Sequence, residues 1–258
     1  MQLNLQKKKF IVVDTFQNLA KGKPSDYNHL IVKRRLRIIE SFDRFYDKNS
    51  DLLEMGCGNG ASLSLINKRF NSCHGIDISK KHLKQFQDVI LKNRITNCTF
   101  SCSDIEEGSS VDKKYDRIIC FEVLEHVKDD THVLKIMFKK LKPNSKIAIS
   151  IPNKWWIFET HGAHLPLLPW NRVPFFSWLP KSIHGKYAKA KNYEANEIRN
   201  LLTKVGFKIV DIKYINAPMD MVPFKFIQNI LRSTIFKNDT TNIPFFSTSI
   251  MLFAEKPN

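Results

Sequence analysis

Residues 51–61 read DLLEMGCGNGA, the most informative stretch of this sequence. The short apolar run DLLEM is followed directly by three glycines at alternate positions, Gly56, Gly58 and Gly60. Glycine tolerates the positive φ angles of a tight turn and lets the backbone approach a ligand closely. Helical spacing begins at Ala61, so the free N–H groups of a helix N-terminus would face that ligand. The stretch predicts a strand, a ligand-binding turn and a helix.

Strand-like and helical stretches alternate around this turn. We expect strands at Asp51–Met55, His74–Ile78, Cys98–Cys102, Asp116–Phe121, Lys146–Ile151, Phe207–Ile215 and Phe246–Ala254. We expect helices at Ser25–Tyr46, Ala61–Phe70, Lys80–Asn93, Lys128–Leu141, Glu194–Val205 and Phe224–Phe236. Strands separated by helices of 10–15 residues are typical of βαβ units. The sequence therefore predicts an α/β fold with a doubly wound, seven-stranded sheet.

The 258 residues suffice for one sizeable core with attachments. We expect an N-terminal helical cap at 1–50 and a main domain at 51–258. That domain would comprise a cofactor-binding half at 51–153, a substrate-covering insertion at 154–192, and a C-terminal part at 193–258 with a helical insertion at 217–243.

Composition excludes several classes of protein. No run of 18 apolar residues is present, so we expect no transmembrane helix, and the first residues do not form a secretory signal. The five cysteines lie between residues 57 and 120, which favours buried, reduced thiols of a cytoplasmic protein over a disulfide framework. Cys98 and Cys102 have no second Cys or His pair nearby, and no metal site is expected.

The net charge of +16 is the second compositional signal. Most of the excess lies outside residues 51–153. Such a field favours an anionic partner, namely nucleic acid, a phospholipid surface or a phosphorylated substrate. A merely solubilising surface is an equally good interpretation.

The glycine-rich turn alone leaves two cofactors open. Residues 56–61 also fit the G-x-G-x-x-G/A fingerprint of dinucleotide-binding proteins. Glu54, two residues before the glycines, would repel a pyrophosphate but would suit the ammonium of a methionine moiety. Asp77 ends the next strand, where an acid can accept both ribose hydroxyls. Asp104 follows the third strand and could accept the adenine amino group. These acids favour an adenosine linked to methionine over a nicotinamide dinucleotide.

With these features the sequence resembles the class I S-adenosylmethionine-dependent methyltransferases, in particular the branch that methylates quinones and small molecules. The resemblance rests on the E-x-G-x-G-x-G loop, Asp77, Ser103-Asp104 and the run FEVLEH at 121–126. It implies a Rossmann-like strand order of 3-2-1-4-5-7-6 with the seventh strand antiparallel. It also implies S-adenosyl-L-methionine as cofactor, bound by Glu54, Gly56, Cys57, Gly58, Gly60, Asp77, Ile78, Ser103, Asp104, Ile105, Phe121 and Glu122.

His126 and Glu122 are the catalytic candidates. Methyl transfer from a sulfonium is an in-line displacement, so a base is needed only where the acceptor loses a proton. On a helix, Glu122, Glu125 and His126 would share one face, and His126 could be that base. The alternative is that His126 only packs at the helix start. Some quinone O-methyltransferases with a similar E-x-x-E-H run are thought to bind a divalent metal there, but this run alone does not define such a site.

The insertion at 154–192 is placed to cover the acceptor, because ligands of parallel sheets bind beyond the carboxyl ends of the strands. It contains Trp155, Trp156, Trp170, Trp178 and basic residues that include Arg172. His161 and His164 could bind a metal, but packing or hydrogen bonding is the better interpretation. The helix expected at 224–236 either packs onto the domain or lies in a membrane interface.

We therefore expect a methyltransferase whose acceptor is small and hydrophobic or lipid-linked, met at an anionic membrane surface. RNA is the alternative acceptor, because basic, aromatic surfaces stack bases and follow phosphates, although no RNA-binding module is recognisable. Alternatives of another class are a non-catalytic protein that binds a nucleoside cofactor and an NAD-dependent oxidoreductase.

Overall fold

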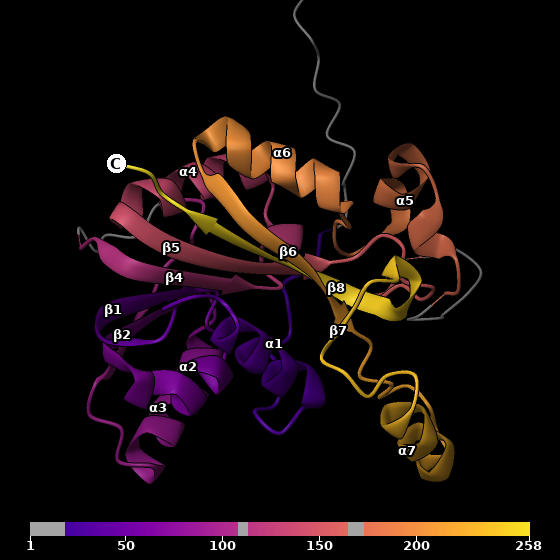
Figure 1. Ribbon diagram of the computed structural model, residues 1–258, viewed down its shortest axis with the longest axis horizontal. Helices are drawn as coiled ribbons and strands as arrows, with labels where there is room; N and C mark the ends of the chain where they lie inside the picture. Colours follow the sequence, from indigo (N-terminus) through magenta and orange to yellow (C-terminus); the bar gives the residue numbers. More distant parts are fainter. Residues whose placement is uncertain (1–18, 108–112, 165–172) are drawn as a thin grey trace, which may run out of the picture.

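The computed structural model describes residues 19–107, 113–164 and 173–258. The sheet order is β3-β2-β1-β4-β5-β8-β6-β7 (Figure 1). The strands are β1 Asp47–Met55, β2 Phe70–Asp77, β3 Cys98–Cys102, β4 Tyr115–Phe121, β5 Leu141–Pro152, β6 Lys208–Asn216, β7 Thr240–Thr241 and β8 Ser247–Glu255. The helices are α1 Leu30–Glu40, α2 Ala61–Ile66, α3 Lys80–Lys92, α4 Asp130–Lys140, α5 Lys181–Tyr187, α6 Ala195–Val205 and α7 Lys225–Ser233.

The sheet confirms the predicted doubly wound architecture. The strands β1 to β5 pair in parallel, and β8 is antiparallel to both β5 and β6, as expected of the last of seven strands. The one addition is the two-residue β7, which pairs with the edge of β6. Strand order reverses between β1 and β4. In open α/β sheets this reversal places the ligand crevice at the carboxyl ends of those two strands.

Helices cover both faces of the sheet (Figure 1). The helices α1, α2 and α3 bury their apolar stripes against one face, and α4 and α6 bury theirs against the other. Ile39, Phe45 and Phe86 belong to the first core, and Leu134 and Leu202 belong to the second. No described helix is long and apolar enough to cross a bilayer.

The first helix is shorter than the predicted Ser25–Tyr46 and occupies only Leu30–Glu40. Asp26 accepts a hydrogen bond from the backbone N–H of Asn28, which forms a local turn that competes with the helix. Tyr27 lies in this turn and is exposed. Periodicity alone overestimated the helix because the side-chain hydrogen bond of the turn is not part of the apolar pattern.

The cysteines agree with the prediction except at one position. All five are free, and four of them are buried. Cys102 is exposed because it is the last residue of β3, beyond the cover of the neighbouring helix. Cys98, which shares its face of the strand, is buried.

Arg34 lies among the buried apolar residues of α1 and is itself buried, at 2% exposure. Its guanidinium donates hydrogen bonds to the carbonyls of Asn216 and Ala217, at 2.8 Å each, and to the carbonyl of Phe236. These carbonyls lie before and after α7 in the chain. Arg34 therefore fixes the base of the segment that carries α7 to the main core.

Replacing Arg34 by Met should lower the free energy of unfolding by about 3 kcal/mol or more, because three buried carbonyls lose a charged donor. Arg37→Met is the matched control on the same helix. Its side chain is 50% exposed and its ion pair with Asp239 should contribute less than about 1 kcal/mol. Urea unfolding of both variants tests this, and equal losses would show that the buried contacts of Arg34 do not stabilise the fold.

Candidate active site

The turn between β1 and α2 requires glycine at three positions. Gly56, Gly58 and Gly60 have φ angles of +78°, +52° and +72°. A Cβ atom on Gly60 would lie 1.9 Å from the Phe86 ring, and one on Gly56 would lie 2.2 Å from Val123. A larger residue at either position would have a strained backbone and would clash with the neighbouring side chain. The turn thus presents bare backbone at the carboxyl end of β1.

Asp77 connects this turn to the end of β2. One carboxylate oxygen accepts a hydrogen bond from the Gly58 N–H at 2.9 Å, and the other accepts an N–H at the start of α3. The Asp77 carbonyl accepts the N–H of Ser103 at 3.2 Å, so β3 ends beside it. Asp104 accepts the N–H of Glu106 at 2.9 Å. A carboxylate has about four acceptor positions, so both acids retain capacity for ligand hydroxyl or amino groups.

Other residues expected at the cofactor lie around the same strand ends. Ile78 follows Asp77 and leaves 45% of its side chain exposed, an apolar surface that a flat ring could cover. Cys57, Ile105 and Phe121 are buried and support the crevice from below. All of these residues lie at or just after the carboxyl ends of strands β1 to β4.

Glu54 carries a buried carboxylate at the end of β1. Its side chain is 3% exposed, and its Oε2 atom has no hydrogen-bond partner among the described residues. Burial raises the pKa of Glu54 to about 8, an effect that hydrogen bonds from Ser62 and the Leu63 amide oppose and the negative charge of Asp77 increases. A buried carboxylate that lacks a partner is stabilised by a cationic ligand. The predicted contact with an ammonium group therefore fits this position.

The helix face predicted for Glu122, Glu125 and His126 is wrong. Glu122 has a φ of +55°, and only Leu124–His126 forms a single 3₁₀ turn. The left-handed residue ends the strand, so Glu122 and the following turn do not form the regular helix that the spacing assumed. Its carboxylate accepts the Ser150 hydroxyl at 2.7 Å and forms an ion pair of 3.0 Å with Arg35 of α1. Glu122 is therefore held by protein groups and is a poor candidate for a free base.

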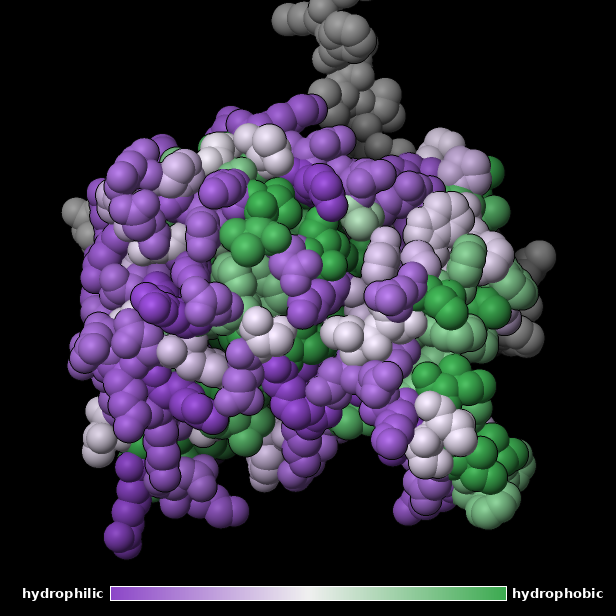
Figure 2. Space-filling view, in the orientation of Figure 1, coloured by the Kyte–Doolittle hydropathy of each residue, from purple (hydrophilic) through white to green (hydrophobic). Residues whose placement is uncertain are grey.

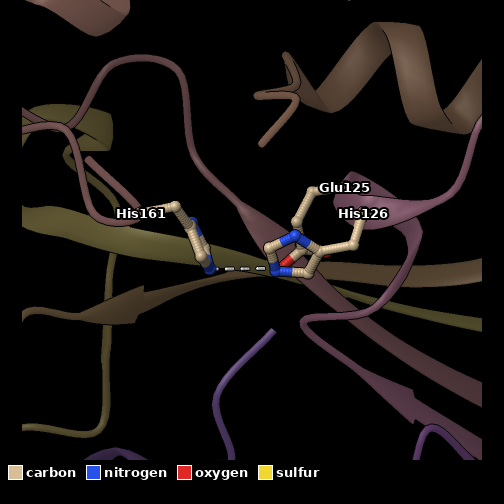
Figure 3. Close-up of side chains that lie close together, drawn as sticks. All are labelled: Glu125, His126 and His161. Atoms are coloured by element: carbon tan, nitrogen blue, oxygen red, sulfur yellow. Dashed lines mark ion pairs between the residues drawn. The ribbon is translucent and has the colours of Figure 1, made fainter. Parts of the chain in front are cut away.

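The buried Glu125 and the partly buried His126 and His161 form a cluster at this edge of the sheet, and Figure 3 shows their side chains pointing toward one another. Glu125 is 0% exposed, and neither carboxylate oxygen accepts a hydrogen bond from a residue that the structure describes. Its Oε1 lies 3.5 Å from Nε2 of His161 and 3.9 Å from Nε2 of His126. The two imidazole rings meet edge to face at 4.9 Å.

The surroundings of the cluster shift the pKa values of Glu125 and His126. Burial, followed by the nearby Glu122, raises the pKa of Glu125 well above its usual range. Burial and the neighbouring His161 lower the pKa of His126 to about 4, and Glu122 and the Ala20 carbonyl offset only part of that shift. His126 is therefore a neutral imidazole at pH 7, with its lone pair available to a ligand.

His161 reaches the cluster from the insertion, which sequence analysis did not foresee. The sequence paired it with His164, but that residue is exposed. The buried Glu159 holds the loop, because its carboxylate accepts the His161 backbone N–H at 3.3 Å and hydrogen-bonds to the His184 ring at 2.7 Å. Contacts between residues 35 positions apart leave no local pattern. Trp170 and Arg172, also expected in the insertion, lie outside the described residues.

The segment before α1 covers the turn, a second feature that sequence analysis missed. Pro24 packs against Gly58, where an added Cβ would meet it at 2.7 Å. Gly22 packs against the His126 ring, 3.1 Å from a Cβ built on it. Such a cover excludes water from the groups beneath it. The glycine and proline residues of this segment predict only a loop, and nothing in them indicates what the loop covers.

The donors of the cluster suit two kinds of chemistry. One ligand atom from each of the three residues lies within 4.8 Å of the others, and imidazole with carboxylate is a common donor set for divalent cations. The same groups can also accept a proton or orient a hydroxyl group. The sequence predicted no metal ligand, and the structure assembles three candidates from two distant segments.

Comparisons with known proteins identify methyltransferases that are similar to this chain. A family model described as a methyltransferase domain matches residues 27–212. A ubiquinone biosynthesis O-methyltransferase of Coxiella burnetii is 27% identical over 202 residues, which cover 77% of this chain and 79% of that protein. The corresponding enzyme of Rickettsia canadensis is 28% identical over 217 residues, covering 81% and 86%.

A solved S-adenosylmethionine-dependent methyltransferase of Mesorhizobium loti has the same fold, with a TM-score of 0.60 at 13% identity and coverage of 86% of this chain and 97% of that one. The family match extends over most of the chain and includes the glycine-rich turn, Asp77 and the FEVLEH run. The chain therefore belongs to the methyltransferase-domain family and is a class I S-adenosylmethionine-dependent methyltransferase.

Proposed function

We propose that this enzyme methylates a hydroxyl oxygen of a small, hydrophobic or lipid-linked acceptor, which binds between the glycine-rich turn and the insertion. The observation that carries the proposal is the buried cluster of Glu125, His126 and His161 at the carboxyl end of β4. A hydroxyl group becomes a good nucleophile only as it loses its proton, and these three side chains are placed to assist that loss.

The cofactor would lie across the ends of β1 to β4. Glu54 would contact the ammonium group, Asp77 the ribose hydroxyls and Asp104 the adenine amino group. The bare backbone around Gly58 would line the methionine moiety. Support for this arrangement comes from the unpartnered Oε2 of Glu54 and from the remaining acceptor capacity of both aspartates.

His126 has the lone pair needed to accept a hydrogen bond from the acceptor hydroxyl. Its pKa of about 4 makes it a weak base, so the oxygen needs additional stabilisation as negative charge develops. A divalent cation held by Glu125, His126 and His161 would supply this stabilisation by Lewis-acid activation of the hydroxyl. The lone pair of His126 would then bind the cation in place of the hydroxyl proton. Glu159 would keep His161 in place through its contacts with the loop backbone and His184.

The acceptor class rests on the aromatic insertion and on the relatives. Trp155, Trp178 and Phe245 pack with ring centroids 5.4–6.4 Å apart, and Phe175 extends this surface. Rings of this kind offer apolar contact and stacking to a hydrophobic ligand. The curated relatives act in ubiquinone biosynthesis, which is consistent with a hydrophobic ring as acceptor.

The affinity for S-adenosylhomocysteine, which carries the same ammonium group, should rise with pH between 6 and 8. Glu54 has a pKa of about 8 and is mostly protonated at pH 6, whereas the bound ammonium favours the charged form. The limiting slope is about tenfold per pH unit. Calorimetric titrations should show this slope for the wild type and a nearly flat profile for Glu54→Gln. A flat wild-type profile would place the ammonium elsewhere.

Methyl transfer should fall by about 100-fold or more in His126→Ala and in His161→Ala, while affinity for S-adenosylhomocysteine stays within a factor of a few. Transfer is measured with labelled cofactor and separated lipid, RNA and small-metabolite fractions. His164→Ala is the matched control, because this exposed histidine lies on the same loop and should retain full activity.

Excess chelator should reduce wild-type transfer to the level of His161→Ala. If chelation leaves the rate unchanged while both histidine variants are inactive, the cluster acts without a cation. Full activity of both variants would overturn the proposed role of the cluster. Label entering RNA alone would replace the proposed acceptor class by nucleic acid.

A further inference from the structure

Helix α7 is unusual because it has no buried residue, unlike the other helices in the described part of the chain. In Figure 1 it stands apart from the sheet. Phe224 and Phe226 are 66% and 76% exposed. Four more apolar side chains are 40–56% exposed, namely Met221, Ile227, Ile230 and Ile235. Figure 2 shows this region as a green projection from a largely purple molecule.

The exposed apolar residues are organised by the helix. Phe226, Ile227 and Ile230 lie on one face at helical spacing, and Lys225 and Arg232 lie on the polar side. Leu231 follows Ile227 by one turn, at the edge of this face, and packs against the small cluster of Trp156, Ala217 and Phe236. The helix is thus attached along one edge and presents an apolar face that no described residue covers.

The charge that remains around α7 is positive when residues that form ion pairs are left out of the count. The two acidic residues of the connection are already paired, Asp220 with Arg232 and Asp239 with Arg37. Lys225 and Lys237 are exposed and form no ion pair with a described residue. Two free ammonium groups beside an apolar face are the combination that favours anionic lipid surfaces.

We propose that α7 binds this protein to the surface of an anionic lipid bilayer, with Phe224, Phe226 and Ile230 entering the headgroup region. A second copy of the chain is a poorer occupant. Contact between two copies through this segment would bring their lysines Lys225 and Lys237 together, whereas an anionic surface offers these lysines counter-charges. A narrow projecting helix is also the shape that inserts into an interface rather than one that covers a flat face.

The position of α7 connects the membrane to the acceptor site. Its base packs on Trp156, five residues before His161 in the insertion. Arg34 holds the same base from α1, next to the Arg35 that pairs with Glu122. The bilayer would thus lie beside the aromatic insertion. This link to the acceptor rests on the proposed function, whereas lipid binding by α7 does not.

Co-sedimentation of the full chain tests the inference. The vesicles are phosphatidylcholine with one-third phosphatidylglycerol, compared with pure phosphatidylcholine. The wild type should bind the anionic vesicles, and Phe226→Ser/Ile230→Ser should lower the partition coefficient by about tenfold or more. Lys225→Gln/Lys237→Gln should cause a roughly tenfold loss on anionic vesicles only and weaken the salt dependence.

Matched controls replace residues of similar exposure on other helices. Leu65→Ser/Leu91→Ser removes two exposed apolar side chains from α2 and α3, and Lys84→Gln/Lys92→Gln removes two exposed lysines from α3. Both should bind vesicles like the wild type. The α7 variants should lose vesicle binding alone. Their melting temperatures, their affinity for S-adenosylhomocysteine and their methyl transfer to a detergent-dispersed acceptor should stay unchanged.

No vesicle binding by the wild type at low salt would overturn the inference, as would equal binding by the α7 variants. A wild-type dimer in sedimentation velocity that the α7 variants convert to monomers would assign the face to a second copy. Vesicle binding without methyl transfer to any lipid would contradict the proposed acceptor and leave the lipid-binding role of α7 intact.

Discussion

Two buried carboxylates with few hydrogen bonds from the described residues define the chemistry of this protein. Glu54 at the end of β1 and Glu125 just after β4 are 3% and 0% exposed, and three of their four oxygens lack a hydrogen bond from the protein. The strands β1 and β4 are neighbours at the point where strand order reverses. Burial without a counter-charge raises both pKa values. A site built in this way favours ligands that bring positive charge.

The two carboxylates suit different parts of one reaction. Glu54 lies beneath the turn that approaches the cofactor, and a sulfonium cofactor with an ammonium group supplies the charge that this position lacks. Glu125 lies beside two imidazoles under the insertion, where an acceptor must be activated and aligned. Because the nucleophile has to approach in line with the S–CH₃ bond, positioning by the surrounding elements contributes much of the rate enhancement. The segment around Pro24 covers the glycine-rich turn and reaches the His126 ring through Gly22.

Most of the fold could be predicted from the sequence because its signals are local. The turn at 54–60 has its own glycine spacing, and each parallel strand is a short apolar run. The first helix was predicted too long because a hydrogen bond from Asp26 ends it early. Arg34 is a charged residue among the apolar residues of α1. It binds backbone carbonyls near residue 217 and at residue 236, and the sequence around α1 contains no signal of these distant partners.

The sequence placed the cofactor candidates at one edge of the sheet, but it did not reveal the contact between His161 and Glu125. Glu54, Asp77 and Asp104 follow strands in sequence, so the βαβ order alone places them at one edge. His161 meets Glu125 only because Glu159 and His184, buried within the insertion, fix the loop. The helical spacing assumed for Glu122 and His126 failed because Glu122 adopts a left-handed conformation. Long-range contacts and single backbone angles are the features that sequence periodicity does not contain.

Infrared difference spectroscopy tests the central claim most directly, because it observes protonated carboxyl groups themselves. At pH 7 the free enzyme should show the band of a buried, protonated carboxyl group from Glu54. Adding S-adenosylhomocysteine should remove that band and produce the carboxylate signal, and Glu54→Gln should lack the change. A wild-type difference spectrum identical to that of Glu54→Gln would contradict the account, because the Glu54 carboxyl would then gain no positive partner from the ligand.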